Sequence, residues 1–154
     1  MKSKQILSPL AFDRKEKVNK ILLIASSCRY ADQQAEELSN PKRKRSMHYC
    51  IDDHQIIEVV PEEKLALATQ LSRLDEGSIS ICVCTSGIPF LTFSEGTQAK
   101  IVELCADICK RNELPASAIE TYYGGAYLNT ILPKIIRLVE EKLAKKSKRK
   151  EKAK

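Results

Sequence analysis

Two runs of apolar residues constrain the fold of this chain more than any other feature. Lys20 to Ser26 (KILLIAS) and Ser78 to Cys84 (SISICVC) are rich in apolar side chains between polar ends. Runs of this length are typical of strands that are covered on both faces of a sheet. The longest uninterrupted apolar stretch, Ile21 to Ala25, is far shorter than the roughly 18 residues that a membrane span requires. We therefore predict a globular domain with a buried sheet and no membrane partner.

The segments around these two runs alternate between helical and strand-like patterns. Pro61 suits the first turn of a helix, and the two carboxylates that follow it favour the same assignment. Ser94 is a predicted helix N-cap, and Asp53-His54 separates two strand-like segments as the turn of a β-hairpin. The pattern predicts helices over Ala31–Leu38, Pro61–Leu71, Thr97–Asn112 and Pro133–Lys146, and further strands over Ser46–Asp52, Gln55–Val60 and Ile119–Tyr123. This order predicts an α/β fold: a single domain with a mixed central β-sheet flanked by helices.

The formal net charge of +6 is carried by the C-terminal end of the chain. Residues 145–154 (KKSKRKEKAK) hold seven basic residues and one acidic residue, and the rest of the chain has 19 of each. We expect an irregular segment over 1–18, a folded domain over 19–144, and a basic tail over 145–154 that extends the last helix and becomes disordered. The tail has no aromatic side chains, so we expect at most weak, nonspecific nucleic-acid contact or contact with an acidic protein; a role in solubility is the alternative.

The cysteines indicate a reducing compartment. They fall in strand-like and helical segments, as small core residues do, and form no disulfide framework in the sequence. The N-terminal residues also lack the apolar stretch of a secretory signal, so we expect a cytoplasmic protein. A replacement metal site built from thiols, or a Cys82 nucleophile paired with His48, is the less favoured alternative. The six positions are Cys28, Cys50, Cys82, Cys84, Cys105 and Cys109.

Two segments carry a more specific pattern. They are SMHYCIDDHQIIEVVPEE, over 46–63, and LCADICKRNELP, over 104–115. With the strands around them, they resemble the zinc-dependent N-acetylmuramoyl-L-alanine amidases, the group that includes the amidase-2 enzymes, the peptidoglycan-recognition proteins and the bacteriophage lysozymes. The resemblance extends over about residues 6–140. Both segments belong to the scaffold of that group, so they indicate the fold rather than the activity.

The resemblance implies three zinc-ligand positions, and this chain has no ligand at any of them. In the family, two His residues and a Cys or Asp hold the ion, which polarises the amide carbonyl and its bound water. The first His position falls on Ala25, the second on Tyr122, and the third ligand position, before a proline, on Leu132. The family's strand Glu falls on Cys82, and residues 119–140 contain neither His nor Asp. The resemblance thus implies a degenerate member with no metal, cofactor or catalytic residue.

A catalytically inactive amidase-like protein that binds a ligand in the former active-site cleft is the first functional hypothesis. The ligand would be a peptidoglycan fragment or another small anionic molecule. The clustered tyrosines would form an aromatic floor or fill the space left by the metal. The alternatives are a phage or mobile-element regulatory protein that binds and inhibits another protein, and, less favoured, an active amidase. The candidate lining residues are Ala25, Ser26, Ser27, Met47, Ala68, Cys82, Tyr122 and Tyr123.

Four consecutive cations are a separate candidate site. Adjacent cations attract polyanions because binding releases counterions from the polyanion. A solvated loop is the simpler interpretation of such a run. The residues are Lys42, Arg43, Lys44 and Arg45.

Overall fold

Strands β3 (Lys20–Ser26) and β7 (Ser78–Cys84) lie side by side at the centre of the sheet and confirm the two predicted strands. They pair in parallel, from Lys20 opposite Ser78 to Ser26 opposite Cys84, and every residue of β7 is buried. The structure, a computed structural model, describes residues 4–152.

The main sheet is mixed and has six strands in the order β1-β5-β4-β7-β3-β8. β4 and β5 pair antiparallel, as the predicted hairpin requires, whereas the other neighbours are parallel. β2 and β6 form a separate two-stranded antiparallel sheet. The remaining strands are β1 (Lys4–Gln5), β2 (Ala11–Asp13), β4 (Tyr49–Ile51), β5 (Ile56–Glu58), β6 (Lys64–Ala66) and β8 (Ile119–Thr121).

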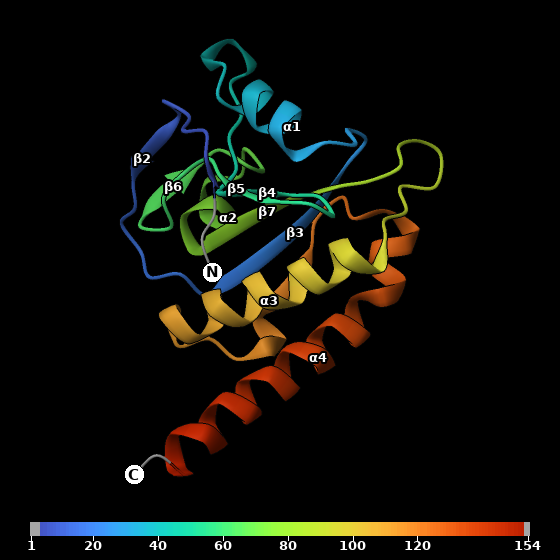
Figure 1. Cartoon of the computed structure of the whole chain (residues 1–154). Coiled ribbons are helices and arrows are strands. Elements are labelled where there is room, and N and C mark those ends of the chain that lie inside the picture. Colours follow the sequence, from blue (N-terminus) through green and yellow to red (C-terminus); the bar gives the residue numbers. More distant parts are fainter. Residues whose placement is uncertain (1–3, 153–154) are drawn as a thin grey trace.

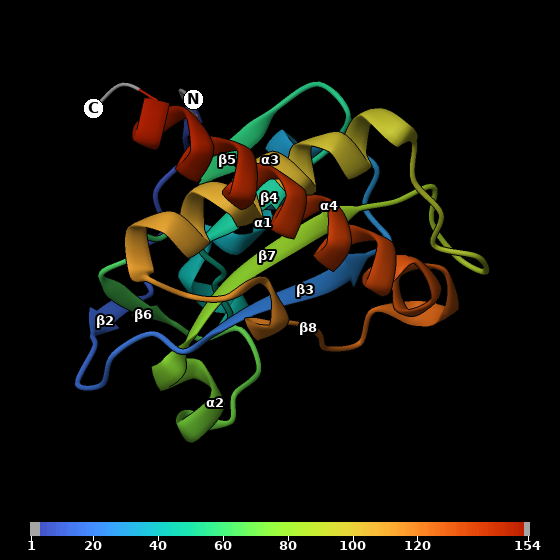
Figure 2. The same ribbon diagram turned by 90° about the horizontal axis from the view of Figure 1, so that it is seen from below.

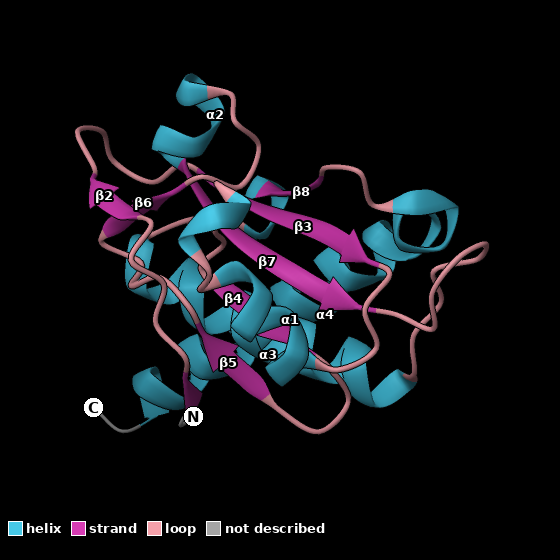
Figure 3. Cartoon of the chain, turned by 90° about the horizontal axis from the view of Figure 1, so that it is seen from above, coloured by secondary structure: helices cyan, strands magenta, loops and turns pink. Residues whose placement is uncertain are grey.

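Helices cover both faces of the main sheet, which confirms the predicted fold class (Figure 1). α1 (Ala31–Leu38) lies on one face, and α3 (Glu95–Asn112) and α4 (Gly125–Lys152) lie together on the other (Figure 2). Figure 3 shows α1 in front of the sheet and the short α2 (Ser72–Gly77) at its end. No helix in the described part of the chain is long and apolar enough to span a bilayer.

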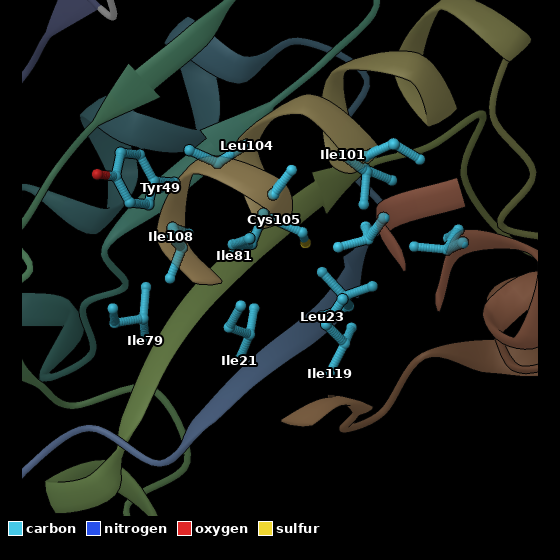
Figure 4. Close-up of a cluster of buried hydrophobic side chains, with 14 of the residues drawn as sticks. Ile21, Leu23, Tyr49, Ile79, Ile81, Ile101, Leu104, Cys105, Ile108 and Ile119 are labelled. Atoms are coloured by element: carbon cyan, nitrogen blue, oxygen red, sulfur yellow. The ribbon is translucent and has the colours of Figure 1, made fainter. Parts of the chain in front are cut away.

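The pleat of β3 divides its side chains between two cores. Ile21 and Leu23 pack in the cluster beneath α3 and α4, where Figure 4 shows them beside Ile81 and Ile119. Leu22 and Ile24 face the cluster beneath α1 instead. This alternation follows from the two-residue repeat of a strand. Alternate side chains of β3 therefore face α1 on one side of the sheet and α3 and α4 on the other.

The predicted helix from Pro61 to Leu71 is wrong. Residues Lys64–Ala66 form β6, which pairs with β2 so that Leu65 lies opposite Phe12. The helix begins only at Ser72. A strand from the N-terminal segment therefore overrides the local helix signal, and β1 and β2 also fall within the segment that we expected to be irregular.

The last helix is longer than predicted at both ends. α4 begins at Gly125, because Leu128 on its first turns is fully buried and extends the apolar stripe that packs on α3. Pro133 lies inside the helix rather than at its start. α4 continues through Lys152, so residues 145–152 are helical where we expected a disordered tail, and residues 153–154 lie outside the described residues.

Ser94 is the N-cap of α3, as predicted. Its hydroxyl accepts a hydrogen bond from the Thr97 amide at 3.1 Å. Ser94→Ala leaves this amide without its partner, so we expect the free energy of unfolding to fall by about 1 kcal/mol. Urea denaturation measures this change. Ser72→Ala, at an exposed position that caps no helix, is the control, and an equal loss in both variants would contradict the capping role.

Candidate functional site

Two neighbouring cavities open on the α1 face of the sheet, and we call them together the cleft. They share Ile24, Ala25 and Arg45, and their volumes are about 430 and 240 Å³. Ala68, Thr69, Gln70, Tyr122 and Tyr123 complete the lining of the larger cavity, and Ser26, Ser27, Gln34, Leu38, Met47 and Cys82 complete that of the smaller one. The structure thus brings all eight candidate lining residues together around the end of β3.

The residue of β3 that faces the cleft is one position earlier than expected. The Ile24 side chain belongs to the buried cluster beneath α1, whereas Ala25 packs against the cluster on the opposite face. Ala25 nevertheless contributes to the lining of both cavities. A shift of one residue exchanges the two faces of a strand. The side chain presented to the cleft is therefore isoleucine, which offers no metal-binding atom.

The tyrosines after β8 line the larger cavity without filling it. The Tyr122 amide donates to the Leu23 carbonyl at 3.0 Å, which ties this residue to the edge of the sheet. The rings of Tyr122 and Tyr123 meet edge to face with centroids 4.8 Å apart, and Tyr123 is 79% exposed. Tyr127 lies elsewhere, against Phe93. Two of the three clustered tyrosines therefore form one aromatic wall of the cleft.

Arg45 is the only Lys, Arg, Asp or Glu side chain that lines either cavity in the described part of the chain. Its Nε donates to the Ala68 carbonyl at 3.1 Å, which holds the guanidinium between the two cavities. No carboxylate pairs with it among the described residues. An arginine held in this way presents its remaining N–H donors to any acceptor that enters the cleft.

The four consecutive cations lie in different surroundings, so they do not form a single binding site. Lys42, Arg43 and Lys44 are exposed, and Arg43 lies 3.7 Å from Glu37. Lys44 has a left-handed backbone conformation, with φ of 54°, that turns the chain toward the buried strand. Arg45 directly precedes Ser46, which is fully buried. The sequence interpretation grouped Arg45 with the other three cations, and the separation follows from the structure, in which the chain becomes buried directly after it.

The residues of the cleft do not fit a zinc ion. Leu132, at the third implied ligand position, lies in α4 and packs against the core beneath that helix. Within residues 4–152, no group of three His, Cys, Asp or Glu side chains is arranged to hold a metal. The guanidinium of Arg45 adds a positive charge that would repel a divalent cation. The donor set thus differs from the His and Cys or Asp set that zinc prefers.

Neither histidine reaches the cleft. His48 is buried, with Nδ1 accepting from the Ser80 amide at 3.0 Å and Nε2 donating to the Lys64 carbonyl at 2.8 Å. Burial lowers the pKa of this imidazole to about 4, so it is neutral at pH 7. Both ring nitrogens are engaged, so His48 has none left to activate Cys82. His54 is exposed on the β4–β5 turn, 3.5 Å from Asp53.

Several solved structures share this fold. The structure of PlyL aligns with a TM-score of 0.73 at 18% identity, over 91% of this chain and 98% of PlyL. The Staphylococcus aureus hydrolase AmiA, solved in complex with its ligand, gives a TM-score of 0.76 at 12% identity, over 96% of this chain and 85% of AmiA. The N-acetylmuramoyl-L-alanine amidase LysC from Clostridium intestinale gives 0.68 at 11% identity, over 89% of this chain and 98% of LysC. No protein with a curated description matches.

Sequence identities this low show only a shared fold, so the assignment to a family rests on the match to a family profile. The profile of N-acetylmuramoyl-L-alanine amidase matches residues 15–133, which include all strands of the main sheet except β1, together with α1, α3 and the cleft. This range covers most of the chain and agrees with the segment of the sequence that resembles those enzymes. The chain belongs to the N-acetylmuramoyl-L-alanine amidase family.

Proposed function

We propose that this protein is a catalytically inactive member of its family that binds a small anionic ligand in the cleft. The lining of the cleft supports this proposal: it includes Ala25 and Tyr122, on which the resemblance places the first two zinc ligands, and neither side chain is a zinc ligand of the family. A hydrolytic step would need a group that activates water, and the cleft-lining side chains include neither His, Asp nor Glu. Ligand binding is the function that the remaining side chains support.

The position of Arg45 is the observation that carries this proposal. A guanidinium held by one hydrogen bond and unpaired by any described carboxylate favours an anion with planar geometry, such as a carboxylate. Polar side chains surround it: Thr69 and Gln70 in the larger cavity, which donate to Asp75 and to the Lys44 carbonyl, and Ser26 and Gln34 in the smaller, which are hydrogen-bonded to each other. Their remaining hydrogen-bonding capacity is available to a ligand. A peptidoglycan fragment combines a carboxylate with amide and hydroxyl groups, so its chemistry matches this lining.

Titration calorimetry with N-acetylmuramoyl-L-alanyl-D-isoglutamine, in the presence of a chelator, tests the proposal. The native protein is expected to bind one molecule per chain. Arg45→Gln removes a charge-assisted hydrogen bond of about 1.5–3 kcal/mol, so the dissociation constant is expected to rise about 10- to 100-fold. Arg43→Gln, on the same turn but exposed, is the matched control and is expected to bind as the native protein does.

Equal affinities of the native protein and Arg45→Gln would overturn the assignment of Arg45. No heat and no thermal shift across a panel of muropeptides and small carboxylates would overturn ligand binding itself.

The unpaired state of all described cysteines supports the further proposal that the protein acts in a reducing, cytoplasmic compartment.

The loop between β7 and α3 favours a second candidate function, binding to another protein. The Ser86 amide donates to the Thr92 carbonyl at 2.7 Å, and Leu91 packs against Gly125 at the start of α4. This ordered loop presents two large apolar side chains to solvent: Ile88 is 82% exposed and Phe90 is 75% exposed. Exposed apolar side chains on an ordered loop are a feature of protein-interaction sites. A regulatory protein that blocks a partner would use such a loop and would need no metal.

A pull-down with the purified chain separates this candidate from the first. One stoichiometric partner that Ile88→Ser with Phe90→Ser abolishes, and that Phe12→Ser at a distant exposed position leaves intact, would support it. Recovery of only salt-sensitive, sub-stoichiometric material would instead indicate nonspecific contact through the basic residues of α4.

A further inference from the structure

Three thiols gather in the buried cluster on the α1 face of the sheet, and one of them, Cys82, lines the cleft. Cys50 on β4 lies directly opposite Cys82 on β7 in the parallel register, and Cys84 follows two residues later on the same face as Cys82. All three are nearly or fully buried in the cluster beneath α1. The cluster lies apart from Cys105 and Cys109, which belong to the core on the opposite face.

Cys82 is the member of this cluster that small molecules reach through the cleft. It lines the smaller cavity together with Ser26, Met47 and Arg45. That cavity, at about 240 Å³, is many times larger than a water molecule or a peroxide. The Cys50 sulfur lies behind Cys82 on the neighbouring strand and is fully buried.

The surroundings of Cys82 also favour its thiolate. The thiols of Cys50 and Cys84 share its buried cluster, and Arg45 lines the same cavity as Cys82. These groups, with the Cys50 thiol first, hold the pKa of Cys82 well below its usual range. The same contact and burial raise the pKa of Cys50. A thiol in its thiolate form is the nucleophile toward peroxides and disulfides.

We propose that Cys82 is a peroxide-sensitive thiol whose oxidation ends in a disulfide with Cys50. The Cys82 thiolate attacks hydrogen peroxide, so that an S–O bond forms, the O–O bond breaks, and hydroxide leaves. The sulfenic acid at Cys82 then reacts with the Cys50 thiol: the S–S bond forms, the S–O bond breaks, and water leaves with the thiol proton. Peroxide is reduced by two electrons, and the two thiols supply them.

The sheet register favours Cys50 over Cys84 as the second thiol. Neighbouring strands lie about 4.8 Å apart, which is within the Cα spacing of disulfides. Cys84 is two residues along the same strand from Cys82, at about 6.6 Å, near the upper limit of that spacing. The Cα atom of Cys82 therefore lies closer to that of Cys50, across the sheet, than to that of Cys84, along its own strand.

Peptide mass spectrometry of the native protein tests the proposal without any substitution. The folded protein is treated with hydrogen peroxide, quenched with catalase, and alkylated after denaturation. We expect two of the six thiols to be lost, and a linked peptide pair that contains Cys50 and Cys82. In Cys50→Ala, dimedone is expected to trap a sulfenic acid at Cys82. Cys109→Ala, outside the cluster, is the matched control and is expected to form the same disulfide as the native protein.

Three results would overturn the proposal. The first is a native protein that keeps all six thiols at a peroxide dose that oxidises free cysteine. The second is a linked pair other than Cys50 and Cys82. The third is oxidation of Cys105 or Cys109 within about tenfold of the rate at Cys82, since thiols of the other core would then be equally reactive. Melting curves of the two alanine variants establish that each is folded at the temperature of the assay.

Discussion

Replacing the half-buried Arg14 with methionine is expected to lower the free energy of unfolding by about 1.5–3 kcal/mol. Its guanidinium reaches from the N-terminal segment into the body of the domain. It donates to the carbonyls of Lys64 at 2.9 Å and Ser78 at 3.1 Å, to that of Glu62 at 3.1 Å, and to that of Glu76. Each carbonyl left without a donor costs about 1–3 kcal/mol where water cannot replace it. Urea denaturation measures the loss.

The neighbouring residue provides the control for Arg14. Asp13 pairs with Lys64 at 2.8 Å on the surface, where solvent screens both charges. Asp13→Asn is expected to leave the urea midpoint essentially unchanged, and Arg14→Lys to give an intermediate loss because one ammonium replaces fewer of the hydrogen bonds. A loss in Asp13→Asn as large as that in Arg14→Met would contradict the role of the guanidinium as a hub.

Lowering the pH from 7 to 5 is expected to lower the free energy of unfolding by about 2 kcal/mol through His48. Burial holds the pKa of this imidazole at about 4 in the folded protein, against 6.5 for the free group. As the pH falls through 6.5, the unfolded chain binds a proton that the folded chain does not. The contribution of neutral His48 is therefore complete above pH 6.5 and is lost progressively toward pH 4. Urea denaturation at several pH values measures this slope.

Variants of the two histidines separate their contributions to the slope. His54→Gln, at the exposed hairpin turn, is expected to keep the full loss between pH 7 and pH 5. His48→Gln is expected to unfold more easily at pH 7, since it disturbs the contacts to Ser80 and Lys64, but to lose the slope. A slope that survives in His48→Gln and disappears in His54→Gln would contradict this assignment.

The sequence predicts the fold well wherever local signals agree with the tertiary structure. The strands β3 and β7 and the helix α1 have the predicted bounds, because continuous apolar runs and local helix propensity suffice to specify them. The segment after Pro61 fails for the opposite reason. Its helix signal is local, but β6 pairs with β2 about 50 residues earlier in the chain, and no short-range pattern encodes that pairing.

For the cleft, the sequence predicts which residues lie there but not which way each side chain points. The resemblance to the family brought eight lining residues to one place, but the side chain that β3 turns into the cleft is Ile24 rather than Ala25. A one-residue error in alignment reverses the face of a strand, so sequence spacing alone cannot settle it. Arg45 was predicted as one of four polyanion-binding cations but not as a cleft residue, because its direction depends on the left-handed turn at Lys44.

Zinc stoichiometry is the most direct test of whether the cleft has become a metal-free binding site. Untagged protein is dialysed against zinc, then against buffer without zinc, and its metal content is measured by plasma emission. With isoleucine facing the cleft, Arg45 beside it and no group of three His, Cys, Asp or Glu side chains within residues 4–152 arranged to hold a metal, we expect fewer than about 0.1 zinc ion per chain. One zinc ion retained per chain, together with release of peptide from muramoyl-L-alanine substrates, would contradict the proposed function.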